Sequence, residues 1–168
     1  MSRSAKIGSC IQLPLGGERW GYIQFIGPGI HGDAVRVLPG TFPDPLSADQ
    51  VGILVSGDES FIAQTFVLSA LDLPKAKVVL LSPTRSSSEL APWWVLSPIP
   101  TLFEDRWVIS FDGSRQYRMA DFLKEHPEID PRNLPETAVN GEGVLQDMIR
   151  MGWRPAYGEF SVWRTLQE

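Results

Sequence analysis

Glycine and proline interrupt this chain so often that long regular elements are excluded over most of its length. The 168 residues include 15 glycines and 14 prolines, together above the roughly 12% of average proteins. Both residues favour turns, and both destabilise the interior of a helix. Hydrophobic residues make up 43% of the chain, which is enough for an ordinary core. The sequence therefore predicts a mainly β (α+β) fold built from many short elements.

A β-hairpin near the N-terminus is the clearest local pattern. Ile7–Leu15 reads as one strand, with Pro14 near its end, and Trp20–Ile26 reads as its partner because aromatic and β-branched residues dominate it. Between them lies Gly16-Gly17, which supplies the positive φ angles that a tight hairpin turn requires. The sequence predicts an antiparallel pair here.

Shorter apolar runs continue the pattern. Strands are expected at Ala34–Leu38, Phe61–Leu68, Lys77–Leu81, Trp93–Leu96, Trp107–Phe111 and Phe160–Arg164. Val51–Val55 is short and apolar. Loops without regular structure are expected at 39–50, 84–89 and 127–143, where prolines or serines cluster.

Two late segments have helical character. Met119–His126 ends before Pro127, and Val144–Met151 carries an apolar face with Gly152 placed to cap it. We therefore expect a twisted antiparallel sheet or open barrel with one or two C-terminal helices. One domain, 1–168, would contain a β core at 5–111 and a helix-containing C-terminal extension at 112–168.

No residue pattern predicts catalysis, a metal site or a cofactor. Cys10 is the only cysteine and lies inside a predicted strand, where a buried apolar role is expected. His31 and His126 lie 95 positions apart, without the spacing of a zinc site. Gly27, Gly29 and Gly32 match a dinucleotide-binding fingerprint, but Pro39 follows too soon for a crossover helix. We expect a loop there, and no enzyme activity.

Acidic residues concentrate in one stretch. The net charge is −5, and no basic stripe suggests nucleic-acid binding. A single base, Arg36, lies between Asp33 and Glu59, against five acids that we predict to bind a partner: Asp33, Asp44, Asp49, Asp58 and Glu59. An acidic surface speeds the capture of a basic partner, although a merely solvated surface would carry the same charges.

A pair of adjacent tryptophans offers a second predicted contact. Because neighbouring residues on a strand point to opposite faces, Trp93 and Trp94 would place one ring in the core and one outside. An exposed Trp93 would be a natural anchor for a partner or a ligand. In the alternative arrangement both rings are buried, one of them under the late helices.

The N-terminal hairpin resembles a known family. Lys6-Ile7-Gly8, then Ile11–Leu15, then Gly17–Tyr22 are similar to the opening hairpin of the immunity protein 26 family, bacterial immunity proteins of polymorphic toxin systems. Trp94–Pro100 is similar to a downstream tryptophan-containing strand of that family. The chain departs from the family pattern at two places. Ser9 stands where the family has an acid, and Gln24 stands near the position where the family has its second glycine. The resemblance covers about residues 5–111.

The resemblance implies that the chain neutralises a cognate bacterial toxin by covering its active site. A toxin that acts on nucleic acid has a basic cleft, which the acidic stretch would match. The N-terminus lacks an apolar leader and no run is long enough to span a membrane, so we expect a cytoplasmic protein. The alternative functions are a small-ligand or peptide-binding β-barrel regulatory module, using Trp93 or Trp20, and an enzyme of unfamiliar type.

Overall fold

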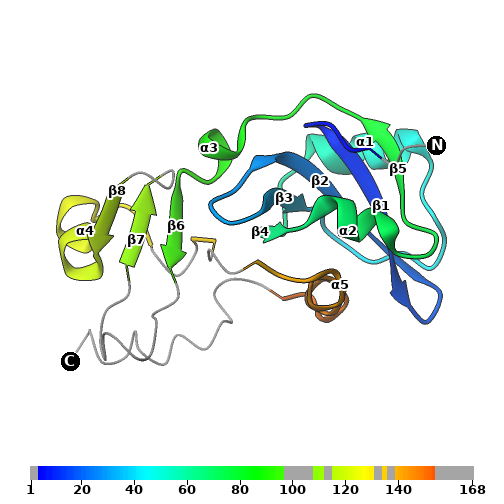
Figure 1. Ribbon diagram of the computed structural model, residues 1–168. Coiled ribbons are helices and arrows are strands. Elements are labelled where there is room, and N and C mark those ends of the chain that lie inside the picture. The colour runs from blue at the N-terminus through cyan, green and yellow to red at the C-terminus, as the bar shows by residue number, and fades with distance from the viewer. Residues whose placement is uncertain (1–3, 97–107, 112–114, 131–133, 136–138, 154–168) are drawn as a thin grey trace.

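The computed structural model describes residues 4–96, 108–111, 115–130, 134–135 and 139–153 (Figure 1). These residues form two antiparallel sheets and five helices. The strands are β1 (Ser9–Gly16), β2 (Arg19–Pro28), β3 (Asp33–Val37), β4 (Phe61–Thr65), β5 (Lys77–Leu81), β6 (Trp93–Leu96), β7 (Val108–Phe111) and β8 (Arg115–Arg118). The helices are α1 (Ala48–Ser56), α2 (Val67–Asp72), α3 (Ser87–Leu90), α4 (Met119–Glu125) and α5 (Glu142–Met151).

The larger sheet has five strands in the order β4-β3-β2-β1-β5. The first four strands follow one another as an antiparallel meander, and β5 returns to pair with β1. The central hairpin turns where Gly16, Gly17 and Glu18 have φ values of 78°, 55° and 59°. Such angles are accessible to glycine at little cost, which is why this sequence turns here.

Both faces of the larger sheet are covered, so it is the middle layer of three (Figure 1). On one face Ile11, Leu13 and Ile23 pack with residues of α2 and α5. On the other face Cys10 and Tyr22 pack with residues of α1. Strands buried on both faces lose the simple alternation of polar and apolar residues, and β1 accordingly has five consecutive buried residues.

The smaller sheet has the order β6-β7-β8, and α4 packs against one of its faces. Ile109 and Phe122 form the centre of that contact. Trp94 lies on β6 and is only 3% exposed. It packs with Ile26 and Ala91 in a cluster between the two sheets. Trp94 therefore connects the smaller sheet to the larger one.

The predicted mainly β, α+β class with open antiparallel sheets is confirmed, and so are the two late helices. The boundary proposed between 111 and 112 falls between β7 and β8, which pair with each other. The predicted strand Phe160–Arg164 lies outside the described residues. No helix of the described part is long and apolar enough to cross a bilayer.

Several local predictions were wrong. The predicted loop 39–50 ends in α1, which begins at Ala48, and the predicted loop 84–89 contains the start of α3. Phe61–Leu68 is not one strand, because β4 ends at Thr65 and α2 begins at Val67. Strand β8 was not predicted. The segment expected to lack regular structure, 127–143, contains the first two residues of α5.

Candidate partner-binding surface

Helix α1 forms because its ends and its apolar face are well specified. The Ser47 hydroxyl accepts a hydrogen bond from the Gln50 backbone, and the Gln50 side chain accepts one from the Ser47 N–H at 2.9 Å, which is a complete capping box. Asp49 lies in the first turn, where a negative charge favours the helix dipole. Val51 and Val55 face the sheet, so the opposite side of the helix faces solvent.

The loop before α1 is held against the sheet by two aromatic residues of the central hairpin. Trp20 and Phe42 exchange backbone hydrogen bonds of 2.8 and 2.9 Å. The buried Tyr22 hydroxyl accepts a 2.6 Å hydrogen bond from the Leu46 N–H. These contacts fix the path of residues 39–47, and with it the exposed Asp44.

Arg36, the single base of the acidic stretch, is buried under the other end of α1. Its guanidinium donates to the Gly57 carbonyl at 2.7 Å, to the Glu59 carboxylate at 3.0 Å and to the Gln24 side chain at 3.1 Å. A buried cation with this many acceptors is well compensated. Its charge therefore does not reach the surface.

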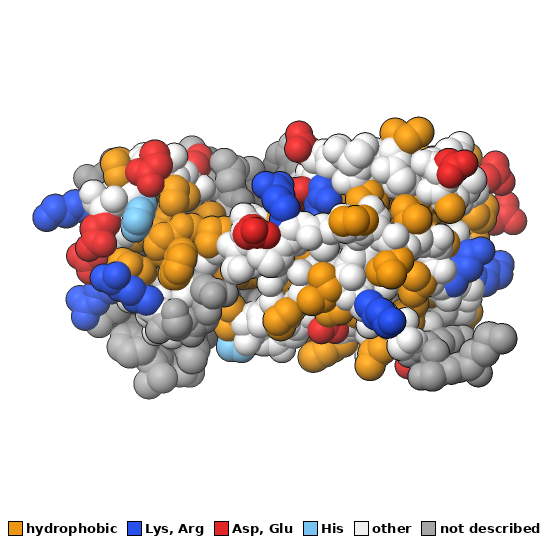
Figure 2. All heavy atoms as spheres, turned by 90° about the horizontal axis from the view of Figure 1, so that it is seen from above, with side chains coloured by type: hydrophobic (Ala, Val, Ile, Leu, Met, Phe, Trp, Pro, Cys, Tyr) orange, Lys and Arg blue, Asp and Glu red, His pale blue; other side chains and the backbone are white. Residues whose placement is uncertain are grey.

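The chain of this region exposes acids and no base of its own, and the neighbouring exposed Arg19 of β2 donates to the Thr41 hydroxyl at 3.1 Å. Between Val37 and Pro74 the chain contains no Lys, Arg or His. Glu59 is neutralised by Arg36, whereas Asp44, Asp49 and Asp58 are exposed and form no ion pair among the described residues. Figure 2 shows acidic side chains along the upper right rim of the larger part of the molecule.

An exposed apolar side chain lies on the same helix as Asp49. Ile53 is 72% exposed, one turn after Asp49 on the solvent side of α1. Asp49 lies in the first turn of α1 and Asp58 follows the Gly57 cap at its end, so Ile53 lies between them along the chain. We call Asp44, Asp49, Ile53 and Asp58 the acidic α1 surface. Sequence reasoning missed Ile53, although the Ser47-x-x-Gln50 pattern signals the helix that exposes it.

The structure does not bring all six predicted contact residues together. Asp33 lies on the other face of the larger sheet, where its carboxylate accepts a 2.9 Å hydrogen bond from the Val67 N–H at the start of α2. Glu59 is engaged by Arg36. Both acids therefore have structural partners, whereas Asp44, Asp49 and Asp58 are exposed on or beside α1 and form no ion pair among the described residues.

Trp93 does not offer the open ring that was predicted. Its ring centroid lies 4.7 Å from that of Phe111, 4.8 Å from that of His126 and 5.0 Å from that of Phe122. Tyr117 completes the group at 5.5 Å. The ring is half-buried between the smaller sheet and α4, so the alternative with both tryptophans packed, one under a late helix, describes the structure better.

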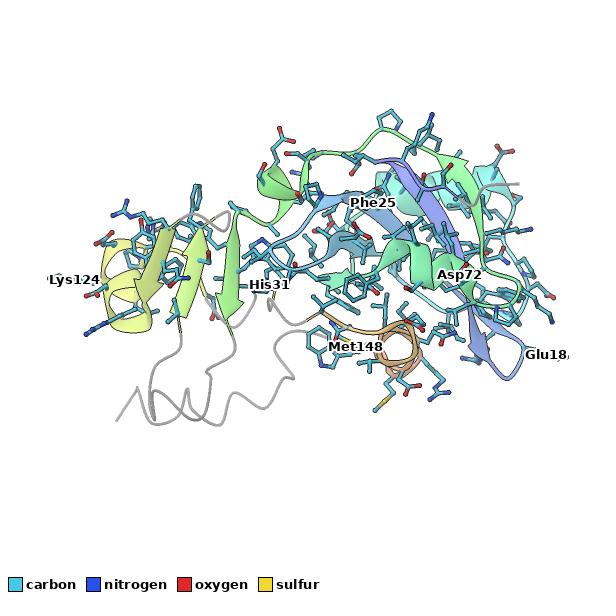
Figure 3. The ribbon with its side chains drawn as sticks, viewed as in Figure 1. Glu18, Phe25, His31, Asp72, Lys124 and Met148 are labelled. Atoms are coloured by element: carbon cyan, nitrogen blue, oxygen red, sulfur yellow. The ribbon has the colours of Figure 1, made fainter. Side chains whose placement is uncertain are left out.

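The described residues hold no group of three or more His, Cys, Asp or Glu side chains placed to bind a metal. Cys10 is buried, and burial raises the pKa of its thiol to about 11, so the unreactive thiol form dominates at neutral pH. His126 packs on Trp93, and Figure 3 shows His31 at the end of the larger sheet that faces β6. These groups are not within reach of one another as an acid–base pair.

The glycine pattern at 27–32 forms a turn between two antiparallel strands. The Gly29 N–H donates to the Gly32 carbonyl at 2.7 Å, and the chain enters β3 directly afterwards. A dinucleotide site needs a helix N-terminus at this point, and the described chain has none there. The expectation of a loop is confirmed.

A cavity of about 310 Å³ opens between the C-terminal end of α5 and the adjoining ends of β3 and β4. Its charged lining residue, Arg150, is paired with Asp147 at 2.5 Å. Neither Trp20 nor Trp93 lines it. The lining also includes the hydroxyl groups of Thr41 and Ser60, and the Thr41 hydroxyl accepts a hydrogen bond from Arg19.

Comparisons with protein-family models, with curated proteins and with solved structures returned no match.

Proposed function

We propose that this chain is an immunity protein that binds a cognate bacterial toxin and covers its active site. The observation that carries the proposal is the acidic α1 surface, which combines three exposed carboxylates on and beside α1 with an exposed apolar side chain of that helix. Interfaces of this kind combine an apolar anchor with charged surroundings that orient the partner. The partner that fits is a protein with a basic cleft, as in a toxin that acts on nucleic acid.

Burial of Arg36 leaves residues 37–74 without an exposed base, and the neighbouring exposed cation is Arg19, which donates to Thr41. With the Arg36 charge exposed, the field over α1 would be partly cancelled. With Arg36 held by Glu59, Gln24 and the helix end, the three exposed acids act together. Complementary fields of this sort raise association rates and reject partners of the same charge.

The residues that carry the family resemblance support the same scaffold. Gly21 packs so closely on α5 that an added Cβ would lie 2.8 Å from Ile149. Tyr22 holds the loop that presents Asp44. Gly8 adopts a φ of 92°, which favours glycine. These residues are buried, so they specify the fold and leave toxin contact to the surface.

An immunity protein of this class meets its toxin inside the cell, which makes the cytoplasm the proposed location. The test begins with the protein encoded next to this chain. Expressed alone it should stop growth, and co-expression with this chain should restore growth and allow the two to co-purify. A neighbour that is harmless, or that is toxic without binding this chain, would remove the proposal.

The contact surface is tested by charge reversal. The double variant Asp44→Lys/Asp49→Lys should lose most of the protection and weaken binding, because the partner's basic cleft would meet four units less negative charge. Glu125→Lys is the control, since it lies beside Lys124 at the far end of α4 (Figure 3). Equal loss in both variants would indicate a general charge effect and exclude this surface.

A further inference from the structure

The cavity beside the C-terminal end of α5 has an apolar floor. Its volume is about 310 Å³, which is at the lower end of the range for small-molecule sites. The apolar side chains that form this floor are those of Val37, Leu38, Phe61 and Ile149. All of them are buried, so the floor is part of the folded core and a ligand would meet an existing apolar surface.

Two local contacts hold the walls of this cavity in place. The ring of Phe61 makes a T-shaped contact with Trp153, with 4.9 Å between the ring centroids. Gly152 ends α5 with a left-handed φ of 64°, and its N–H donates to the Ile149 carbonyl. The cavity is therefore formed before a ligand arrives, which lowers the entropic cost of binding.

The polar side chains of the lining are hydrogen-bond donors. Thr41 and Ser60 contribute hydroxyl groups, and Arg150 contributes a guanidinium. The Thr41 oxygen already accepts a 3.1 Å hydrogen bond from Arg19, so its own proton is available to donate. Among the described residues that line the cavity, none is Asp or Glu. The lining therefore favours a ligand with a negatively charged end.

Arg150 keeps donors for a ligand although it is paired with Asp147. The contact to the Asp147 carboxylate uses Nη2, and a guanidinium carries further N–H donors. Both side chains of this pair are more than half exposed, and exposed pairs hold their members only weakly. The planar guanidinium matches the two oxygens of a carboxylate. Arg150 can therefore bind a carboxylate without breaking a strong contact.

We propose that this cavity binds a small carboxylate that has an apolar body. The body lies on the apolar floor, and the carboxylate accepts hydrogen bonds from Arg150, Thr41 and Ser60. A cation would find no oppositely charged side chain in the lining, and an inorganic anion would leave the floor uncovered. Because α5 and α1 cover opposite faces of the larger sheet, the cavity is not part of the acidic α1 surface. The proposal concerns the isolated chain and does not depend on a toxin.

The first test is a titration of the isotope-labelled full-length chain with phenylacetate, followed by nuclear magnetic resonance. We expect a dissociation constant in the millimolar range, which is ordinary for so small a ligand. The amide signals that should shift and saturate are those of Gly40, Thr41, Ser60 and Gly152, all of which line the cavity. A lack of saturable shifts at these amides overturns the proposal, and so do saturable shifts centred on another part of the chain.

The second test compares probes that differ in charge or in apolar body. Phenylacetamide has the shape of phenylacetate without its charge and should bind about tenfold more weakly, because the charge-assisted hydrogen bonds are lost. Phenethylamine, which is a cation at neutral pH, should bind more weakly still. Acetate carries the charge without the apolar body and should also bind weakly. If any of these probes bound as tightly as phenylacetate, the cavity would not select a carboxylate with an apolar body, and the proposal would be wrong.

The third test removes the charge of the lining. Arg150→Gln should weaken phenylacetate binding about tenfold, and Thr41→Val, which removes a hydroxyl at nearly constant size, should weaken it by a smaller factor. Lys124→Gln is the matched control, because it removes one positive charge from α4, which packs on the smaller sheet. Arg150 and Lys124 are both exposed, so these variants should fold, as circular dichroism would check. Binding that survives Arg150→Gln, or that falls equally in the control, overturns the proposal.

Discussion

Arg36 Nε donates to Glu59 Oε2 at 3.0 Å, and this ion pair joins β3 to the chain that leaves α1. The same guanidinium reaches the Val55 and Gly57 carbonyls at the end of the helix. The acceptors lie 19 to 23 positions along the chain from Arg36. One buried side chain therefore fixes the end of α1 and also removes the only positive charge from the acidic stretch.

Arg36→Ala should destabilise the protein by about 3–5 kcal/mol, because it leaves the Glu59 carboxylate and two helix-end carbonyls without their donor. Glu59→Gln keeps an acceptor for the guanidinium and should cost less, about 1–2 kcal/mol. Urea unfolding followed by circular dichroism measures both. If the two variants were equally stable, the contacts to the helix end would be unimportant.

Gly8→Ala should be strongly destabilising. Gly8 has a φ of 92°, and a Cβ there would lie 2.4 Å from the Ser82 carbonyl oxygen. The left-handed backbone alone costs about 1–2 kcal/mol with a side chain, and the close contact adds to it. Gly143→Ala is the matched control, because it lies in α5 with open space around it and should stabilise by about 0.5–1 kcal/mol. Thermal unfolding of the two variants should shift in opposite directions.

Asp33 and Asp44 should respond differently to the same substitution. Asp33→Ala removes the acceptor for the Val67 N–H and should cost about 1 kcal/mol, as the loss of a helix cap does. Asp44→Ala should change stability by no more than about 0.5 kcal/mol, since the side chain is exposed. Toxin binding should show the opposite order, weakened by Asp44→Ala and little changed by Asp33→Ala.

The parts of the fold that were predicted correctly are those with local signals. The central hairpin combines adjacent glycines with two β-prone runs, and both signals lie within one short segment. The start of α2 depends instead on Asp33, whose carboxylate accepts the Val67 N–H from 34 positions away. Local sequence patterns do not reveal a contact between residues so far apart in the chain. The sequence of Phe61–Leu68 alone therefore predicted a single strand.

The candidate site also combines features that the local sequence predicted with features that depend on tertiary contacts. Exposure of Asp44 and Asp49 followed from the prolines and polar residues around them. The engagement of Glu59 by Arg36 depends on the packing of α1 over β3, which brings the two side chains together. The α1 helix itself was missed because the prolines of 39–50 indicated a loop, although Pro43 and Pro45 precede the helix and a capping pattern begins at Ser47.

The Cys10 thiol predicts a loss of stability in alkaline solution. Burial raises its pKa in the folded protein from 9.0 to about 11, while the nearby Arg36 charge opposes part of that effect. The unfolded chain therefore loses this proton first as the pH rises. The contribution of the neutral thiol is complete below pH about 9 and is lost between pH about 9 and about 11, on the order of 2–3 kcal/mol.

Unfolding free energies of the wild type and of Cys10→Ala at pH 8 and at pH 10 check this effect. The wild type should lose more stability than the variant over that interval. Cys10 should also react with a thiol reagent only after unfolding, because the side chain is 0% exposed. Rapid labelling of the native protein at neutral pH would contradict both the burial and the raised pKa.

A substitution at Ile53 should distinguish an effect on toxin binding from an effect on stability more clearly than a substitution at the acids. The side chain is 72% exposed on α1, so Ile53→Ala removes few core contacts and should alter stability by at most about 0.5 kcal/mol. An interface anchor truncated to alanine commonly loses about 1–2 kcal/mol of binding or more. We therefore expect Ile53→Ala to weaken toxin binding with little dependence on salt, whereas Asp49→Ala should weaken it mainly at low salt, where screening is least. Calorimetric titration at two salt concentrations distinguishes these outcomes, and an Ile53→Ala variant that binds as tightly as the wild type would place the centre of the interface elsewhere.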